Sequence, residues 1–319
     1  MTAQALMSPL LDRTGPTAQA RYEVTTVATF TNRQKGLLAH WALLEEARLT
    51  PKPALVDRRS GGAHTDMSLA LMEASAHRLA PYFAQMASIP LHLPISLRRQ
   101  QLGALGRAAE AAMLQATGGI NTHRGAIWAL GLLVASPGAE PINSVFSLDA
   151  LLSGAAQLAQ TPDISAPPST DSHGRQVCRR YQVGGARAQA EAGFPAVAEQ
   201  GIPVLRASRA RGDHESHARL NALLAIMSQL TDTCVLYRAG RTGLEAMQDG
   251  ARAVLEAGGM ASHAGQRALK QLDQTLRTLN ASAGGAADLL AATLLVDRLC
   301  PMPFSMPSSF YSASQQELL

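Results

Sequence analysis

The chain has 319 residues, about twice the roughly 150 residues of a typical domain, so it can form one large or two ordinary compact units. Apolar residues make up 46% and charged residues 16% of it, a composition typical of a globular, helix-rich protein with a core of Leu, Ala, Val and Ile. Its 28 basic and 24 acidic residues leave a net charge of +4, and the arginines are scattered. A nucleic-acid-binding surface is therefore not indicated.

The cysteine count and the apolar runs indicate the cellular compartment. Cys178, Cys234 and Cys300 are odd in number and widely spaced, so we expect reduced, buried thiols instead of disulfides or a zinc site. No apolar run reaches the roughly 18 residues of a membrane span, and no basic start followed by an apolar stretch indicates a secretory signal. The sequence thus predicts a cytoplasmic protein without a membrane partner.

Helices are the predicted elements, in chain order. Residues 1–35 form an N-terminal arm that stays unassigned, with one short strand signal in 21–30. Apolar residues at Leu37, Trp41 and Leu44 have helical spacing, and Pro51 ends that helix. Further helices are predicted over 66–87, 97–116, 123–135, 146–160, 176–191, 214–237, 242–257, 264–279 and 284–299. The last is apolar on nearly every side, which favours a central position.

Strand signals are almost absent after residue 30, which argues against a parallel α/β fold. We predict an all-α, compact multi-helix domain over 36–299, with the ligand site built from the loops between helices. Residues 161–175 contain three prolines and are the best candidate for a mobile loop, and residues 300–319 form a C-terminal tail.

The first joint between helices, residues 46–66, concentrates charged residues. Lys52 stands between two prolines, and a stiff backbone of this kind suits an ammonium group that binds phosphate. The alternative is a polar surface loop in which Asp66 caps the next helix. His64 and Asp66 alone are not a metal-ligand signature.

The second and third joints contain glycine pairs next to helix starts. Gly118-Gly119 precedes Asn121, His123 and Arg124, and the free N–H groups of such a helix start form a natural anion site. The alternative is a capped helix with a surface arginine. Arg187, in the third joint, lies four residues before Glu191, which fits either an ordinary ion pair or a binding corner.

The last two joints contain carboxylates in apolar surroundings. Asp232 falls late in a predicted apolar helix and needs an arginine, a metal ion or a helix terminus as partner. Arg238 is six residues away and off that face, which leaves an ion or another helix. Asp288 follows Gly284-Gly285 in what we expect to be a first turn, where it suits the helix dipole, and a phosphate-facing N-terminus is the functional alternative.

Five segments, in order, resemble the triphosphoribosyl-dephospho-coenzyme A synthases, which make the prosthetic-group precursor of malonate decarboxylase and citrate lyase. These segments are ALLEEARLTPKPALVDRRSGGAHTDM, GGINTHRGAIWALGLL, GGARAQAEAGFPAV, TDTCVLYRAG and SAGGAADLLAATLLV. One departure is Ala54, where the family usually has glycine after Lys-Pro. The resemblance implies an all-helical transferase that moves the 5-triphosphoribosyl group of ATP to a ribose hydroxyl of 3′-dephospho-CoA and releases adenine.

The resemblance, combined with residue chemistry, gives candidate roles at one expected polyanion pocket. The candidates are Glu46, Asp57 and Asp66 as catalytic residues; Lys52, His64, Asn121, His123, Arg124 and Arg187 for substrate and phosphate; and Asp66 and Asp232 for Mg²⁺. Two alternatives stay open: a non-catalytic nucleotide-binding or partner-docking protein, and a ribosyl transferase with another acceptor hydroxyl. Malonate decarboxylase is the favoured pathway over citrate lyase, and the sequence leaves homo-oligomer formation open.

Overall fold

The computed structural model describes residues 30–139, 147–166 and 172–301. Within these ranges the regular elements are helices and no strand is present, which confirms the predicted all-α class. The strand signal in 21–30 lies almost wholly outside the described residues, as do most of the predicted arm, the middle of the 161–175 loop and nearly all of the tail.

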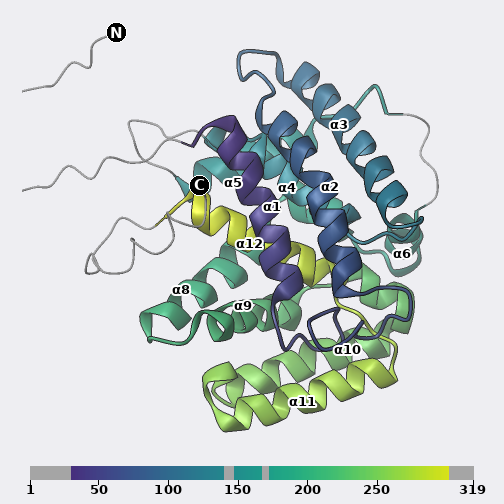
Figure 1. The fold of residues 1–319 in the computed structure, drawn as a ribbon, viewed down its shortest axis with the longest axis vertical. Helices are drawn as coiled ribbons and strands as arrows, with labels where there is room; N and C mark the ends of the chain where they lie inside the picture. Colours follow the sequence, from purple (N-terminus) through teal and green to yellow (C-terminus); the bar gives the residue numbers. More distant parts are fainter. Residues whose placement is uncertain (1–29, 140–146, 167–171, 302–319) are drawn as a thin grey trace, which may run out of the picture.

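Twelve α-helices and three short turns of other helix types follow one another in the described residues (Figure 1). The helices are α1 (Asn32–Arg48), α2 (Leu69–Ala87), α3 (Ile95–Ala116), α4 (Arg124–Val134), α5 (Leu148–Gln160), α6 (His173–Tyr181), α7 (Gly185–Glu191), α8 (Ile202–Ala210), α9 (Glu215–Gln229), α10 (Thr233–Glu256), α11 (His263–Thr278) and α12 (Gly284–Leu299). The short turns are η1 (Pro137–Ala139), η2 (Ala196–Gly201) and η3 (Gly259–Ala261).

Helix α12 lies at the centre, as its apolar sequence predicts. Eleven of its 16 residues are buried, and it packs against α1, α4, α9 and α10. Helices α1 and α2 lie side by side over one face, and α10 and α11 pack along each other at the lower edge of the molecule in Figure 1. This arrangement brings the start of α12 close to the joints that follow α1, α3 and α9.

Two predicted helices are each interrupted in the structure. The expected helix over 214–237 ends at Gln229, and α10 starts at Thr233 after a bend of 64°. The reason is Asp232, whose side chain accepts from the N–H groups of Cys234 and Val235 and so begins a new helix. The helix over 176–191 is similarly divided near Gln182, which has a left-handed φ of 56°.

Several smaller predictions also need correction. Ser68, and not Asp66, caps α2. Asp288 lies past the first turn of its helix. All three cysteines are free, but only Cys300 is buried, whereas Cys234 is exposed. The segment 196–210, for which no helix was predicted, forms η2 and α8.

The described residues contain no single helix that is long and apolar enough to cross a membrane; α9 and α10 meet that test only together, as a bent pair.

Candidate active site

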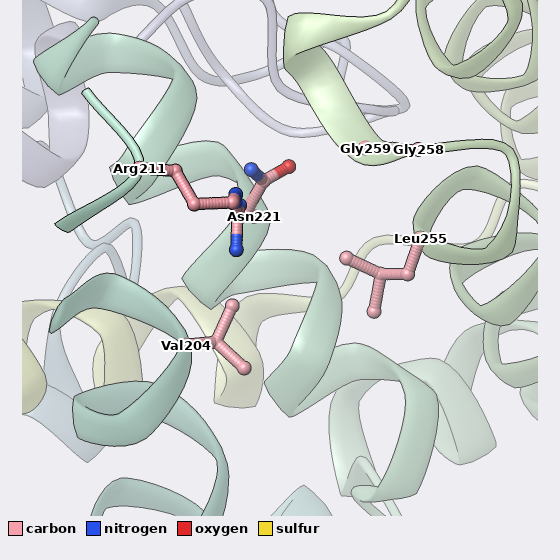
Figure 2. A pocket seen from close by; sticks show the side chains of 6 residues that line it. All are labelled: Val204, Arg211, Asn221, Leu255, Gly258 and Gly259. Carbon is pink, nitrogen blue, oxygen red and sulfur yellow. The ribbon is translucent and has the colours of Figure 1, made fainter. Parts of the chain in front are cut away.

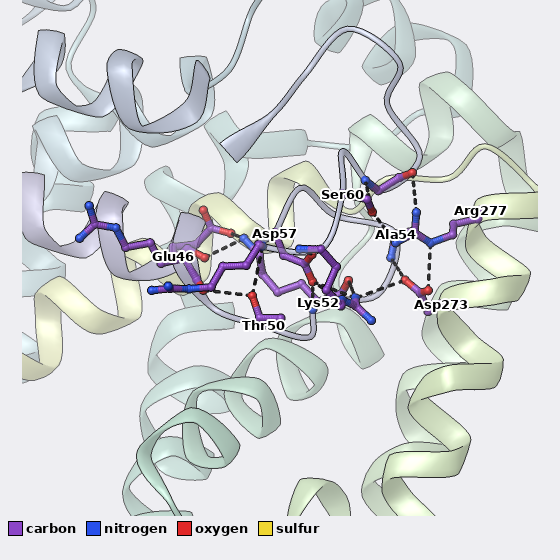
Figure 3. Close-up of polar contacts among 12 residues, drawn as sticks. Glu46, Thr50, Lys52, Ala54, Asp57, Ser60, Asp273 and Arg277 are labelled. Atoms are coloured by element: carbon purple, nitrogen blue, oxygen red, sulfur yellow. Dashed lines mark hydrogen bonds and ion pairs between the residues drawn. The ribbon is translucent and has the colours of Figure 1, made fainter. Parts of the chain in front are cut away.

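Lys52 lies beneath the C-terminal end of α1, in the joint between α1 and α2 (Figure 3). The residue is 1% exposed, and its ammonium donates to the backbone carbonyl of Glu46 at 2.7 Å and forms an ion pair with the Glu46 carboxylate. A buried ammonium needs such compensation, because an unpaired buried charge costs several kcal/mol. The two predicted site residues therefore form one buried pair.

Asp57 holds the loop around Lys52. One carboxylate oxygen accepts from the backbone N–H of Lys52 at 3.0 Å and from Nε of Arg59 at 2.8 Å. The other oxygen accepts from the backbone N–H of Arg59 at 2.8 Å. With its carboxylate committed to these donors, Asp57 is placed to position Lys52, and the catalytic role suggested by the sequence stays a prediction.

The same loop is fixed to α11 from the other side (Figure 3). Asp273 accepts from the N–H of Ala54 at 2.7 Å, and Arg277 donates to the carbonyl of Gly62 at 2.8 Å and to the Ser60 hydroxyl at 3.1 Å. Gly62 has a φ of +67°, and a Cβ there would overlap the backbone of Ala54. Ala54, the departure from the family's usual glycine, itself has a left-handed φ of 54°.

His64 connects this loop to the joint before α12. Its Nε2 lies 2.8 Å from the hydroxyl of Ser282, and its Nδ1 lies 3.6 Å from the carboxylate of Asp66. Burial and the nearby Arg238 guanidinium lower the pKa of His64, which favours the neutral ring. Arg238 donates to the carbonyls of Ala63 and Asn280, at 2.6 and 2.9 Å, and so ties the two joints together.

His123 stands at the start of α4 and is 2% exposed. Its Nδ1 lies 2.8 Å from the hydroxyl of Ser75 in α2, and its Nε2 is buried with no hydrogen-bond partner among the described residues. Burial first, and the positive charge of Lys52 second, lower the pKa of His123 to about 3. The ring is therefore neutral at physiological pH. Asn121 accepts from the N–H of Arg124, the first residue of α4, at 3.1 Å.

Asp232 serves two helices at once. One oxygen accepts from the N–H groups of Cys234 and Val235 at the start of α10, at 2.8 and 3.3 Å. The other accepts from the N–H of Ala286 at the start of α12, at 2.9 Å. Burial raises its pKa, while these amides act in the opposite direction. Another helix is thus the partner that the buried carboxylate required.

Asp288 connects α12 to the start of α4. Its carboxylate lies near the N–H of Ala126, and a Cβ on Gly125 would overlap the end of that carboxylate, so the glycine permits this close approach. Burial, followed by the nearby carboxylates of Glu46 and Asp232, raises its pKa well above the usual value. An ionised Asp288 is therefore unfavourable unless a cation or further donors approach it.

These contacts place the N-terminal ends of α4, α10 and α12 around one point, here called the helix-start centre. Each helix N-terminus carries partial positive charge and free N–H groups, which favour bound anions. The start of α7 lies alongside, because Gly185 lies next to Thr233 and Nε1 of Trp128 donates to the carbonyl of Ala186 at 3.3 Å. Four of the five joints thus meet near Lys52 and His123, and the third lies beside them.

The remaining predicted site residues are at the surface. The side chain of Asp66 is 58% exposed, that of Arg124 is 42% exposed and paired with Glu110, and that of Arg187 is 70% exposed and 2.6 Å from Glu191. Arg187 nevertheless lies near Arg99. Its positive charge is one of the causes that lower the pKa of the Arg99 guanidinium. The expected single cluster is therefore a buried centre with exposed charged groups outside it.

The carboxylates are the natural candidates for Mg²⁺. No group of three His, Cys, Asp or Glu side chains within the described ranges is close enough to hold a metal ion. Magnesium, however, is usually bound by one or two carboxylates together with substrate phosphates. Asp288, with Glu46 and Asp232 near it, fits this requirement. Asp232 alone fits less well, because backbone amides occupy both of its oxygens.

A separate hollow lies between α8, α9 and the turn at Gly258 and Gly259 (Figure 2). Its polar side chain Asn221 accepts from the N–H of Met260 at 2.9 Å and donates to the Ser208 hydroxyl at 3.2 Å. Arg211, which also lines the hollow, donates to the Ser208 hydroxyl at 3.0 Å and to the Asp213 carboxylate at 2.7 Å. Both polar side chains of the hollow are thus already engaged within the fold.

Comparison with known proteins identifies the family. A family model described as ATP:dephospho-CoA triphosphoribosyl transferase matches residues 32–303. The chain belongs to this family. It is 59% identical over 267 residues to a probable 2-(5''-triphosphoribosyl)-3'-dephosphocoenzyme-A synthase of Pseudomonas fluorescens strain Pf-5, covering 82% of this chain and 90% of the relative. A protein of the same name from Azotobacter vinelandii is 57% identical over 267 residues, with 83% and 91% covered.

No solved structure matches the chain significantly. The family membership confirms the resemblance seen in the five segments and the prediction of a transferase, and the alternative of a non-catalytic binding protein is not favoured. Two contributors to the centre were missing from the sequence-based site, Asp288 and Ser75. Asp288 was visible as a carboxylate within an apolar helix, whereas Ser75 carries no sequence signal, since its partner is 48 residues away.

Proposed function

We propose that the helix-start centre binds the triphosphate of ATP and transfers the triphosphoribosyl group to 3′-dephospho-CoA. The observation that carries this proposal is the meeting of three helix N-termini beside the ammonium of Lys52 and an unpartnered nitrogen of His123. A triphosphate is a compact polyanion, and helix N-termini together with a cation are the groups that bind such ligands.

The chemistry requires one bond to form and one to break. A ribose hydroxyl oxygen of dephospho-CoA attacks the anomeric carbon of ATP, the bond from that carbon to adenine breaks, and adenine leaves with the bonding electrons. The hydroxyl proton needs an acceptor, and the departing adenine needs a proton or a strong hydrogen bond. Preorganised charge around the oxocarbenium-like transition state lowers the barrier further.

Glu46 and Lys52 fit these needs through exchange of partners. A phosphate oxygen that approaches Lys52 competes with the Glu46 carboxylate for the ammonium. Once released, the Glu46 carboxylate lies next to the bound nucleotide and can accept the hydroxyl proton. Asp57 keeps Lys52 in place through the backbone N–H during this exchange.

The exposed arginines supply the outer contacts. Within the described residues Arg124 pairs with Glu110 and Arg187 with Glu191, both near solvent, so either side chain can turn toward a phosphate of ATP or the diphosphate of dephospho-CoA. Asp288, together with Glu46 or Asp232, would hold the Mg²⁺ that accompanies ATP. Bound there, it would neutralise phosphate charge. His64 and Asp66 form the outer edge of this site. A cytoplasmic location, where ATP is abundant, completes the proposal.

The test is release of adenine from ATP by the purified protein with Mg²⁺ and 3′-dephospho-CoA, measured by chromatography. We expect adenine and the triphosphoribosyl product in equal amounts, and neither without dephospho-CoA. Lys52→Met is expected to lose activity about 10²–10³-fold, whereas Lys270→Met, at an exposed lysine of α11, should retain it. ATP binding without adenine release under these conditions would contradict the proposal.

A further inference from the structure

A chain of hydroxyl groups ends on the ring of His123. The Thr122 hydroxyl lies 2.7 Å from the Ser75 hydroxyl, which lies 2.8 Å from Nδ1 of His123. Ser75 is fully buried in α2, and His123 is the residue that precedes α4. The chain therefore links two helices and fixes the plane of the ring.

The direction of the first bond determines the second. A hydroxyl group has one hydrogen, so the two bonds of Ser75 are coupled: with Thr122 as the donor to Ser75, the Ser75 hydrogen is free for Nδ1. Nδ1 is then the acceptor nitrogen, and in a neutral ring the hydrogen lies on Nε2. That N–H is buried and has no partner within the described residues. Buried donors are nearly always satisfied, so one without an acceptor indicates a bound group.

The surroundings of Nε2 identify the acceptor. The positive charge of Lys52 acts on the His123 ring, and the start of α4 contributes partial positive charge. An anionic oxygen is therefore the favoured acceptor beside Nε2. We propose that Ser75 and Thr122 are positioning residues that hold His123 in the Nε2–H form, and that this N–H donates to a phosphate oxygen of the ATP triphosphate. This inference rests on the proposed function, since it assumes that the triphosphate occupies this centre.

A definite chemical restriction follows for His123. A neutral ring with the hydrogen on Nε2 cannot accept a proton at that nitrogen, and its low pKa makes protonation on Nδ1 unfavourable. The residue therefore stabilises charge as a fixed neutral donor, and proton transfer in the reaction belongs to the carboxylates. A donor that is fixed in advance stabilises the charge of the transition state without any rearrangement of its own.

The first test is the tautomer, read from ¹⁵N nuclear magnetic resonance of the histidine rings in the full-length protein without substrate. The His123 signals are assigned by their loss in His123→Gln. We expect a neutral ring with hydrogen on Nε2 between pH 6 and 8, and a shift of that nitrogen when ATP and Mg²⁺ are added. A hydrogen on Nδ1, or a doubly protonated ring, overturns the inference. The tautomer is measured without turnover, so the result is independent of the proposed reaction.

The second test separates a donor from a proton carrier. Gln keeps an N–H near the place of Nε2 but cannot transfer a proton, so we expect His123→Gln to keep at least 10-fold more kcat/KM than His123→Ala. Equal losses in the two variants contradict the donor role. If both variants and the wild type release no adenine while the tautomer is as expected, the proposed function fails and the ring assignment stands.

The positioning role has its own matched comparison. Ser75→Ala is expected to lower kcat/KM about 10-fold and to allow both tautomers of His123, and Thr122→Val to do so more weakly, whereas Thr122→Ser restores the wild-type tautomer. The control is Ser136→Ala, which also removes a buried hydroxyl with two hydrogen bonds, to the Leu151 carbonyl and from the Gly138 N–H, near the far end of α4. A Ser75→Ala ring that remains wholly in the Nε2–H form overturns the positioning role.

Discussion

The buried centre and the exposed groups outside it both consist of charged residues, but the partners of these residues differ. Lys52 and Asp232 are almost fully buried, and each polar atom they offer is paired with another charge or with a backbone amide. Arg124 and Arg187 are paired with single glutamates near solvent. The centre is therefore preorganised and part of the fold, whereas the exposed arginines can exchange partners without loss of structure.

The largest expected effect is the loss of one member of the buried pair. Lys52→Ala leaves the Glu46 carboxylate unpaired, and we expect a loss of about 3–5 kcal/mol in the free energy of unfolding in addition to lost activity. This expectation follows from the burial of the pair, which only the structure reveals. Urea unfolding measures it.

A double variant separates the two consequences. Glu46→Gln with Lys52→Met removes both charges, so most of the stability should return while turnover remains at least 10²-fold reduced. A double variant as unstable as Lys52→Ala would show that burial of the pair is not what makes the centre sensitive.

The loop around Lys52 gives the next effect. Gly62→Ala adds a Cβ against the backbone of Ala54 at a left-handed φ, and we expect a loss of about 2–5 kcal/mol from steric overlap and backbone strain. Gly118→Ala is the matched control, because Gly118 has a similar φ of +64° but no neighbouring atom within 4 Å. Thermal unfolding of both variants should show the smaller loss for Gly118; equal losses would mean that overlap contributes nothing.

Asp232 tests whether the centre is held together by caps. Asp232→Ala removes an acceptor from the starts of both α10 and α12, and at about 0.5–2 kcal/mol per cap we expect a loss of about 1–4 kcal/mol. Hydrogen exchange should increase at Cys234 and Ala286 together. Faster exchange at only one of them would refute the shared cap.

The pH dependence of stability distinguishes two titratable groups of the centre. The pKa of His123 is lowered from 6.5 to about 3, so between these pH values the unfolded chain binds a proton that the folded protein does not. The stability that the neutral ring contributes is therefore lost as pH falls from 6.5 toward 3. The pKa of Asp288 is raised above 3.8, so its folded form keeps the proton longer, and stability falls as pH rises above 3.8. Difference curves of His123→Gln and Asp288→Asn against wild type should have opposite slopes.

The smallest effect on stability is expected at the exposed arginines. Arg187→Ala removes a surface ion pair, worth about 0–1 kcal/mol, so the unfolding midpoint should barely change. If Arg187 turns toward a phosphate, KM for ATP or dephospho-CoA should still rise about 10-fold or more. An unchanged KM for both substrates would confine substrate binding to the buried centre.

The sequence predicted most helices from their periodicity, and it located the joints from glycines, prolines and clustered charges. It failed where one side chain decided the local structure. Asp232 ends a helical pattern that its neighbours continue, because its oxygens begin a new helix. The split near Gln182 was missed for a related reason, since a non-glycine residue with a left-handed φ leaves no composition signal.

The sequence by itself determined the all-α class, the joints and, through five ordered segments, the family. Only the tertiary structure decided which charged residues become the interior of the site. Local patterns cannot reveal contacts such as Asp288 with Ala126 or Ser75 with His123, because those residues are far apart along the chain. They meet only when the helices pack against one another, and burial in that packing raises the pKa of Asp288 and keeps His123 neutral.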